Sequence, residues 1–371
     1  MITVKEVVNR KELKQFIMFP FELYKNDKNW VPPLIKGEWA IFDSTKNPAF
    51  DHCEASYFLA YKDNKIVGRV AAIINHKANV RWNEKYTRFG WIAFIDDTEV
   101  SAALLNAAES WGTAKGMKGI HGPLGFSDLD AEGMMVEGFN HEPGIATAYN
   151  FEYYPKHLEM HGYRKAADWV QYKFNASQPV PAKVLHISQI VASKYKVEIC
   201  TPTTKKELLS YAPGIFKTLN ASFKNLYGFV ELSERQIDFY IKAYLRFARP
   251  ELFSILLDES NNVIGFGIGF PSMARALKKA HGRLSLFGFI HIMRALRKYD
   301  MVDLCLMGVH PDWQKKGLHA LYLARMNEQY IKHKIKYAIS TGQLETDARA
   351  LGVWKDYEKE ACFRTRCYIK D

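Results

Sequence analysis

The sequence predicts an α/β protein with two tandem domains, each a sheet flanked by helices. Three observations predict this fold class. The chain has 371 residues, which is more than one hydrophobic core normally serves. Strand-like and helix-like segments alternate along it, as expected for sheets covered by helices. The same order of segments occurs in both halves of the chain, which indicates a duplicated architecture.

The clearest repeated segment is a β-hairpin. In the first half, residues 57–61 and 66–74 are rich in strand-forming side chains and flank a short polar turn that contains Asn64. In the second half, residues 252–257 and 263–270 flank a similar turn. A hydrophobic-hydrophobic-Gly run follows both turns, as Ile66-Val67-Gly68 and as Val263-Ile264-Gly265.

The segments around the two hairpins also correspond. Each half begins with a strand and one or two helices, and the hairpin is followed by a third strand, a long helix, a fourth strand, a further helix and a last strand. In the first half these segments are residues 2–7, 11–24, 90–95, 99–115, 119–122, 153–161 and 169–174. In the second half they are residues 196–200, 205–223, 234–247, 302–309, 318–333, 337–341, 350–360 and 365–370.

A break between the halves is expected after residue 174. The run Asn175-Ala176-Ser177-Gln178-Pro179-Val180-Pro181 is mostly polar and has two prolines, which resist both helix and strand. We therefore expect a first domain over residues 1–174, a linker over 175–185 and a second domain over 186–371.

Composition narrows the class of protein. No apolar run approaches the roughly 20 residues of a membrane span, and the N-terminus is typical of a strand, so a cytoplasmic protein is expected. The five cysteines lack C-x-x-C spacing, which argues against a disulfide framework and a zinc site. His157 and His161 lack an obvious third ligand, so no metal is expected. The net charge of +11 favours an anionic partner without selecting one.

The most specific motif joins the third strand of the second half to its long helix. A buried strand ends in Met307-Gly308-Val309, and Pro311 begins a turn that leads through Gln314-Lys315-Lys316-Gly317 into a helix starting with Leu318-His319-Ala320. Free N–H groups at a helix N-terminus, with lysines beside them, suit a pyrophosphate. An ordinary strand-to-helix turn is the alternative interpretation.

This motif resembles that of the GNAT acyltransferase superfamily, Q/R-x-x-G-x-G/A after a strand. Gln314, Lys315, Lys316 and Gly317 match it in order, whereas His319 stands where a small residue is usual and Ala320 follows it. The order of segments in both halves is also the GNAT order, so the resemblance covers nearly the whole chain. It implies two mixed, mostly antiparallel sheets and an acyl-coenzyme A site, with acetyl-CoA the first candidate.

The resemblance also implies a reaction, direct attack of an amine on the thioester. Met307, Gly308 and Val309 would then offer backbone groups to the pantetheine arm. The superfamily's tyrosine acid falls on Trp354, so Tyr357, one turn later, is the nearest substitute, or else a packed aromatic. Glu345 is a candidate base, although an acid that caps the following helix is the alternative.

Two segments have no role in that motif. In the first half, Asp96, Asp97 and Glu99 stand where a phosphate loop would be, so we expect this half not to bind coenzyme A. Residues 273–299 form a basic, apolar, helix-prone insertion that suits a lid, a clamp for an acidic substrate, a membrane-surface helix or a helix packed on the sheet.

Three functions from different classes follow. The first is an acyl-CoA-dependent N-acyltransferase acting on a small amine or amino acid derivative. The second resembles the tandem-GNAT aminoacyl transferases, in which the basic surface binds transfer RNA, but the basic residues do not interleave with aromatics along a groove. The third is a ligand-binding protein without catalysis, favoured by His319 and Trp354. The sequence predicts no oligomeric state, acceptor or acyl length.

Overall fold

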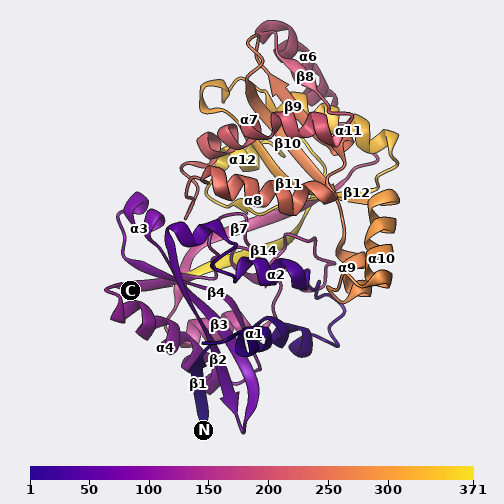
Figure 1. Ribbon diagram of the computed structural model, residues 1–371. Helices are drawn as coiled ribbons and strands as arrows, with labels where there is room; N and C mark the ends of the chain where they lie inside the picture. Colours follow the sequence, from indigo (N-terminus) through magenta and orange to yellow (C-terminus); the bar gives the residue numbers. More distant parts are fainter.

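The computed structural model describes residues 1–371 and contains one continuous 14-stranded sheet. The sheet runs the length of the molecule, with the two halves of the chain at opposite ends (Figure 1). The first half supplies β1 (Ile2–Glu6), β2 (Cys53–Lys62), β3 (Lys65–Asn75), β4 (Tyr86–Phe94), β5 (Gly119–Gly122), β6 (Met134–Glu137) and β7 (Arg164–Asn175). The second supplies β8 (Glu198–Cys200), β9 (Phe253–Leu257), β10 (Val263–Pro271), β11 (Met301–Val309), β12 (Tyr337–Ser340), β13 (Gln343–Leu344) and β14 (Lys359–Lys370).

Helices cover both faces of this sheet. Those of the first half are α1 (Arg10–Leu23), α2 (Ile35–Ile41), α3 (His76–Trp82), α4 (Thr98–Ala114) and α5 (Tyr153–Met160). Those of the second half are α6 (Ala182–Tyr195), α7 (Lys205–Phe223), α8 (Glu234–Tyr244), α9 (Ala274–Ala280), α10 (Leu286–Arg297), α11 (His319–Lys332) and α12 (Ala348–Gly352). The predicted fold class, two tandem α/β units with mixed sheets, is confirmed.

The duplication is visible in the strand pairing. Strands β2 and β3, and likewise β9 and β10, form the two antiparallel hairpins. The next strand of each half pairs antiparallel with its hairpin and parallel with the strand that follows the long helix, as β4 with β5 and β11 with β12. The parallel pairs are possible because α4 and α11 provide the crossover connections that parallel strands require.

Each half has its own core. The larger cluster of 30 buried residues surrounds β9 to β12 and includes Leu321, Tyr322 and Met326 of α11. The smaller cluster of 17 surrounds α4, where Leu104 and Val100 lie close to Gly68 of β3. A Cβ at Gly68 would come within 2.6 Å of Leu104, so the glycine allows helix and strand to approach.

The last strand of each half belongs to the sheet of the other half. The order along the sheet is β1-β2-β3-β4-β5-β14-β7-β12-β11-β10-β9-β8, so β14 pairs with β5 and β7 pairs with β12. The two exchanged strands also pair with each other, from Lys359 opposite Phe174 to Ile369 opposite Arg164. This exchange was not predicted from the sequence.

Strands β4, β7 and β14 begin earlier than predicted, and two helices differ more strongly from the prediction. The helix expected over residues 350–360 is only Ala348–Gly352, because residues from Lys359 onward join β14. Helix α6 begins at Ala182, inside the segment expected to be a linker. Its residues Ile187 and Val191 lie against Gly317, at the start of α11.

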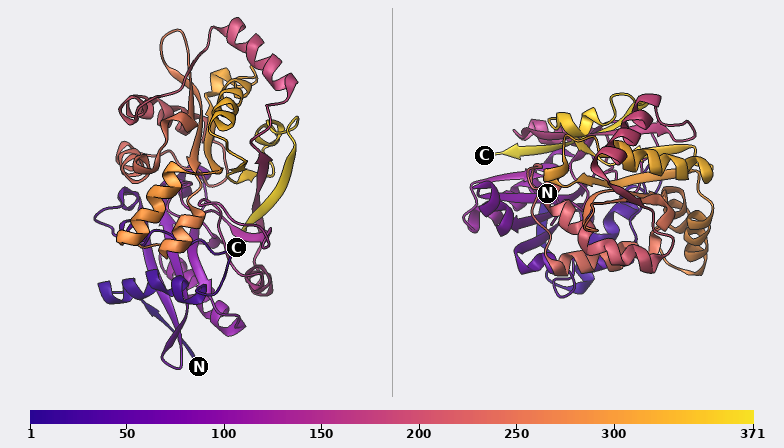
Figure 2. Two further views of the ribbon diagram at one scale, coloured as in Figure 1. Left: turned by 90° about the vertical axis from the view of Figure 1, so that its right-hand side faces the viewer. Right: turned by 90° about the horizontal axis from the view of Figure 1, so that it is seen from above.

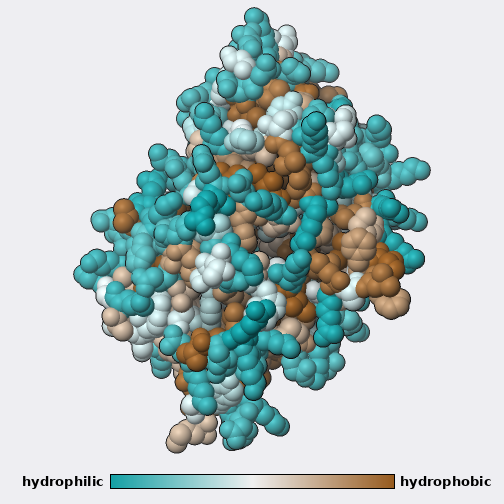
Figure 3. All heavy atoms as spheres, in the orientation of Figure 1, coloured by the Kyte–Doolittle hydropathy of each residue, from teal (hydrophilic) through white to brown (hydrophobic).

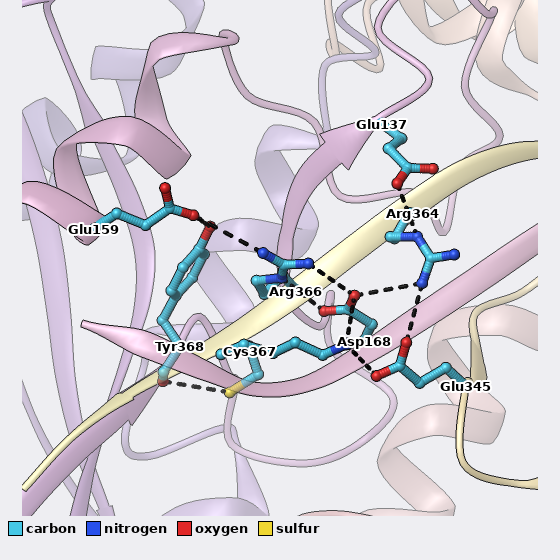
Figure 4. Close-up of polar contacts among 9 residues, drawn as sticks. Glu137, Glu159, Asp168, Glu345, Arg364, Arg366, Cys367 and Tyr368 are labelled. Carbon is cyan, nitrogen blue, oxygen red and sulfur yellow. Dashed lines mark hydrogen bonds and ion pairs between the residues drawn. The ribbon is translucent and has the colours of Figure 1, made fainter.

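A buried carboxylate connects the exchanged strands. The side chain of Asp168 on β7 is 1% exposed and accepts hydrogen bonds from Arg366 on β14 at 2.8 and 3.0 Å. Arg364 also approaches it, at 3.4 Å (Figure 4). Lys165 lies 3.1 Å from the same carboxylate. Burial alone would raise the pKa of Asp168, but the hydrogen bonds from Arg366 and Lys165 outweigh it and hold that pKa below its usual value.

Replacing this carboxylate should destabilise the fold. We expect Asp168→Asn to lower the free energy of unfolding by about 3 kcal/mol at pH 7, because Arg366 and Arg364 lose their buried partner. A pKa lowered in the folded state stabilises above the unfolded value near 4 and ceases to do so as pH falls through the folded value. The difference should therefore shrink below about pH 4. Urea titrations at several pH values measure it.

The exposed pair between Asp51 and Arg235 provides the control. Its side chains are 46% and 70% exposed, so Asp51→Asn should change stability by less than about 1 kcal/mol. Equal losses for the two variants, or a loss for Asp168→Asn that does not depend on pH, would contradict a stabilising role for the Asp168 contacts.

Candidate functional site

The loop between β11 and α11 presents a row of unpaired backbone amides. The N–H groups of Lys315, Lys316, Gly317, Leu318 and His319 donate no hydrogen bond, whereas Gln314 and Ala320 on either side do. Lys315 has a φ of 62° and Gly317 a φ of 82°. Left-handed residues of this kind turn successive N–H groups toward one side, which makes an anion-binding concavity. The loop is therefore more than a minimal connection between strand and helix.

Side chains around the loop fix it and add positive charge. Gln314 donates from Nε2 to the Val309 carbonyl at 3.1 Å and accepts from Arg349 at 2.9 Å, so it joins the end of β11 to the start of α12. Lys315 is exposed, and the ammonium group of Lys316 lies 4.4 Å from the centre of the Trp313 ring. Burial lowers the pKa of His319, so this ring is neutral at pH 7.

The strand that leads to the loop loses a neighbour before its end. Strand β12 pairs with β11 only from Met301 to Leu304, and Thr341 makes the last contacts, to the carbonyls of Leu304 and Cys305. The chain then turns into β13, which pairs with β7. On the side away from β10, the edge of β11 at Met307, Gly308 and Val309 thus has no paired strand. This edge is open to an extended ligand.

A cavity of about 380 Å³ lies beneath α11. Its walls come from β7, residues 175–181, β11, β12, α11 and the turn after α12, and most lining residues are hydrophobic. Three lining groups are buried without a hydrogen-bond partner: the hydroxyls of Tyr330 and Tyr357 and the indole N–H of Trp354. Unpaired buried donors beside an empty space are typical of a site that a polar ligand group completes.

Trp354 and Tyr357 pack against the exchanged strand. The Trp354 ring is 2% exposed and lies 4.4 Å from the ring of Phe174 on β7, and Tyr357 follows at 5.6 Å from Trp354. Burial raises the pKa of the Tyr357 hydroxyl, so this group keeps its proton at neutral pH and is available as a donor. The two residues thus lie together, in a turn instead of the predicted helix.

Glu345 lies away from this cavity. It forms ion pairs with Lys165 and with Arg364, the latter at 3.2 Å, and so belongs to the charged network of Asp168 (Figure 4). Its place is at the crossing of β7 and β14, and it is not among the lining residues of the cavity.

Sequence reasoning missed the carboxylates where the two halves meet. Burial raises the pKa of Asp303 on β11 and of Asp128 in the first half to about 7, and that of Asp130 to about 6. Asp130 and Cys305 both lie close enough to Tyr244 of α8 to influence its pKa, which burial raises. The space-filling view is hollowed near its centre, between α8 and α2 (Figure 3). In the sequence, Asp128 and Asp130 belong to a long polar loop, residues 122–133.

Asp303 is the most buried of these acids. It is 3% exposed, and its Oδ1 atom has no hydrogen-bond partner. Its Oδ2 atom accepts from the Ile145 amide at a long 3.5 Å. Because side chains alternate along a strand, Asp303 faces the first half, whereas its neighbour Leu304 lines the cavity under α11.

The equivalent position of the first half is built differently. Asp97 caps α4 by accepting from the Glu99 amide at 2.9 Å and also pairs with Lys62. Asp96 contacts His157, whose other ring nitrogen lies 2.9 Å from the buried hydroxyl of Ser101. These acids use the N-terminus of α4 internally, so an anion would meet negative charge there.

Solved structures with the same architecture span the whole chain. A tandem GNAT protein from the clavulanic acid biosynthesis pathway superimposes with a TM-score of 0.56 and 9% identity, covering 100% of this chain and 98% of its own. A GCN5-related N-acetyltransferase from Sphaerobacter thermophilus gives 0.54 and 10%, covering 100% and 95%. The chain therefore has the tandem GNAT fold.

Two curated proteins are similar in sequence. Protein YghO of Escherichia coli is 27% identical over 377 residues, which cover 99% of this chain and 95% of YghO. The bacterial ceramide synthase of Caulobacter vibrioides is 27% identical over 329 residues, covering 84% and 82%. No family model matches the chain.

The unpaired hydroxyl of Tyr357 leads to a stability prediction. Tyr357→Phe should change the free energy of unfolding by less than about 0.5 kcal/mol, because the hydroxyl has no protein partner to lose. Tyr154→Phe should cost about 1–2 kcal/mol, since its hydroxyl bonds Tyr24 and the Phe94 amide at 2.9 and 2.8 Å. Thermal unfolding compares them. A Tyr357→Phe loss as large as that of Tyr154→Phe would show that the hydroxyl is satisfied in solution.

Proposed function

We propose that the protein is an acyltransferase that moves an acyl group from acyl-coenzyme A to an amine. The observation that carries this proposal is the row of five unpaired amides from Lys315 to His319 at the start of α11. With Lys315, Lys316 and Arg349 nearby, this row suits the pyrophosphate of coenzyme A. The tandem GNAT fold, shared with N-acetyltransferases, supports the same interpretation.

The proposal also includes a binding surface for the pantetheine arm of the coenzyme. In this proposal the open edge of β11 at Met307, Gly308 and Val309 receives the pantetheine arm, and one of its amides polarises the thioester carbonyl. Gln314, Leu318 and Ala320 hold the loop and the first turn of α11 in shape. Bound acyl-CoA supplies the activated acyl group, with acetyl-CoA the first to test.

Two proton transfers complete the reaction. The Tyr357 hydroxyl, protonated and unpaired, is the proposed donor to the leaving thiolate. Asp303, with a pKa near 7 and one free oxygen, is the proposed base that takes the proton of the amine, directly or through water. Glu345, the base expected from the sequence, is proposed instead to position β14 and β7 through Arg364 and Lys165.

The cleft between the halves is the proposed acceptor site. Carboxylates such as Asp128, Asp130 and Glu38 attract an ammonium group, and their raised pKa values indicate that a bound cation would relieve the cost of their burial. A small amine or amino acid derivative meets this requirement. Similarity to a protein named as a ceramide synthase adds amines with a long apolar chain to the acceptors to be tested.

The loop should determine binding of acyl-CoA. We expect Gly317→Asp and Lys315→Glu each to weaken binding at least about tenfold, because each brings negative charge to the unpaired amides. Isothermal titration calorimetry with acetyl-CoA and with longer acyl-CoAs measures the affinity. Gly116→Asp, at a glycine with the same φ of 82°, controls for backbone strain, and Gly317→Ala controls for the contact of a new Cβ with Val191 and Ile187.

Three outcomes separate the alternatives. Absence of acyl-CoA binding by the wild-type protein, or an equal loss in Gly116→Asp, would contradict the proposed site. Tight binding without turnover across a panel of amines would favour a ligand-binding protein without catalysis. Salt-sensitive binding of aminoacyl-tRNA in place of acyl-CoA would favour the aminoacyl transferase.

The proposed base, Asp303, should determine how kcat/KM depends on pH. For the wild-type enzyme, we expect kcat/KM to fall as pH decreases through about 7, because protonated Asp303 cannot accept the amine proton. Asp303→Asn should lower kcat about 100-fold or more and remove this limb. Steady-state rates between pH 5 and pH 9 provide the measurement.

Glu345→Gln separates the two candidate bases. This variant should keep the acidic limb of the profile and most of kcat, since Glu345 is bound in ion pairs outside the cavity. Loss of the limb in Glu345→Gln, with Asp303→Asn unaffected, would return the role to Glu345.

A further inference from the structure

The helix pair α9–α10 carries an exposed apolar surface. Five large hydrophobic side chains gather at the loop between the helices and at the first turn of α10, and Phe287 and Leu286 are 75% and 74% exposed. The other three are Leu284, Phe289 and Ile290. We call these five residues the apolar tip. Hydrophobic atoms are conspicuous where α9 and α10 lie in the space-filling view (Figure 3).

The segment that carries the apolar tip is rich in cations and contains no acid. Residues 273–299 contain seven Lys or Arg residues and not one Asp or Glu. Arg275 and Lys278 pair with Glu142 of the first half. The remaining five have exposed side chains that make no ion pair or hydrogen bond: Lys279, Arg283, Arg294, Arg297 and Lys298.

The side of the α9–α10 pair opposite the apolar tip packs against the rest of the molecule. Ile292 and Leu296 of α10 and Leu277 of α9 pack in a small core of their own. The Gly282 carbonyl, in the loop between the helices, accepts from the Ile35 amide at 3.0 Å. The packed helix pair therefore holds the apolar tip in a fixed position at the junction of the halves, on the outside of the molecule (Figure 2).

We propose that the apolar tip and its surrounding cations dock the protein on an anionic phospholipid bilayer. Aromatic and aliphatic side chains beside unpaired Lys and Arg are the combination by which interfacial helices bind membranes. The acyl region receives Phe287, Leu286 and their neighbours, while the five unpaired cations face lipid phosphates. The proposed attachment is peripheral. No helix of the structure has the length and apolar character to cross a bilayer.

Other occupants fit the surface less well. A second copy of the chain docked tip to tip would bring two acid-free, cationic segments together, which mutual repulsion opposes. A nucleic acid would satisfy the cations but leaves five hydrophobic side chains without a partner. A bilayer with anionic headgroups satisfies both parts of the surface.

Co-sedimentation of the full chain with vesicles tests the proposal. The expected result is binding to phosphatidylcholine vesicles that contain phosphatidylglycerol, little binding to pure phosphatidylcholine, and weakening at high salt. Leu286→Asp with Phe287→Asp, and separately Arg294→Glu with Arg297→Glu, should each reduce binding at least about tenfold. These side chains are exposed, so the variants should keep the wild-type melting temperature.

Matched controls lie on and next to α3, on the opposite side of the molecule in Figure 1. Val80→Asp removes an equally exposed hydrophobic side chain, and Lys77→Glu with Lys85→Glu makes the same change in net charge. Both controls should bind vesicles like the wild type.

Three results would overturn the proposal. One is absence of binding to anionic vesicles at low salt. Another is an equal loss of binding in the α3 controls, which would mean that net charge alone is responsible. The third is a dimer in sedimentation velocity that the Leu286→Asp, Phe287→Asp variant abolishes, which would assign the surface to a second copy. None of these measurements depends on acyltransferase activity, so the proposed function is tested separately.

Discussion

The antiparallel pairing of β7 with β14 is the contact on which the rest of the molecule depends. Without it the sheet would separate into two parts, each ending in an unprotected edge. Asp168 lies in the middle of this pairing and is held by Arg366, Lys165 and Arg364. Its carboxylate is buried whereas the cations reach solvent, so the charges satisfy one another without the full cost of burying both partners.

The same pairing shapes the candidate site. Strand β7 holds β12 through residues 173–175 and β13 through Trp169 and Val170, which draws the chain away from β11 after Leu304. Strand β14 begins directly after the turn that contains Trp354 and Tyr357, and Phe174 of β7 supports the Trp354 ring. The open edge of β11 and the cavity beneath α11 thus both depend on strands exchanged between the halves.

Local features of the fold could be predicted from the sequence, and pairings across the chain could not. The hairpins, the third strands and the long helices follow from side-chain alternation and periodicity, which short segments encode. The exchange of β7 and β14 could not be predicted, because the residues within a strand do not specify a pairing partner that lies far away in the sequence. The motif from Gln314 to Gly317 also lies within one short segment, so it predicted the position of the loop. Asp303 was missed because its raised pKa comes from burial, which exists only in the folded molecule; the amide of Ile145 from the other half, which bonds it, opposes that rise.

The two halves of the duplicated chain use equivalent elements differently. The first half uses the N-terminus of α4 to bind its own Asp97, and instead supplies the loops that approach β11 and α8, through Ile145 and Ser127. Charged groups are also distributed unevenly over this basic protein. Asp128, Asp130 and Glu38 lie near the buried Arg88 and Arg69, while cations without ion pairs lie at the β11–α11 loop and on α10. Under the proposed function, an amine acceptor would approach the carboxylates between the halves and an acyl-CoA donor the cations of the β11–α11 loop, so the two substrates would bind from different sides without competing.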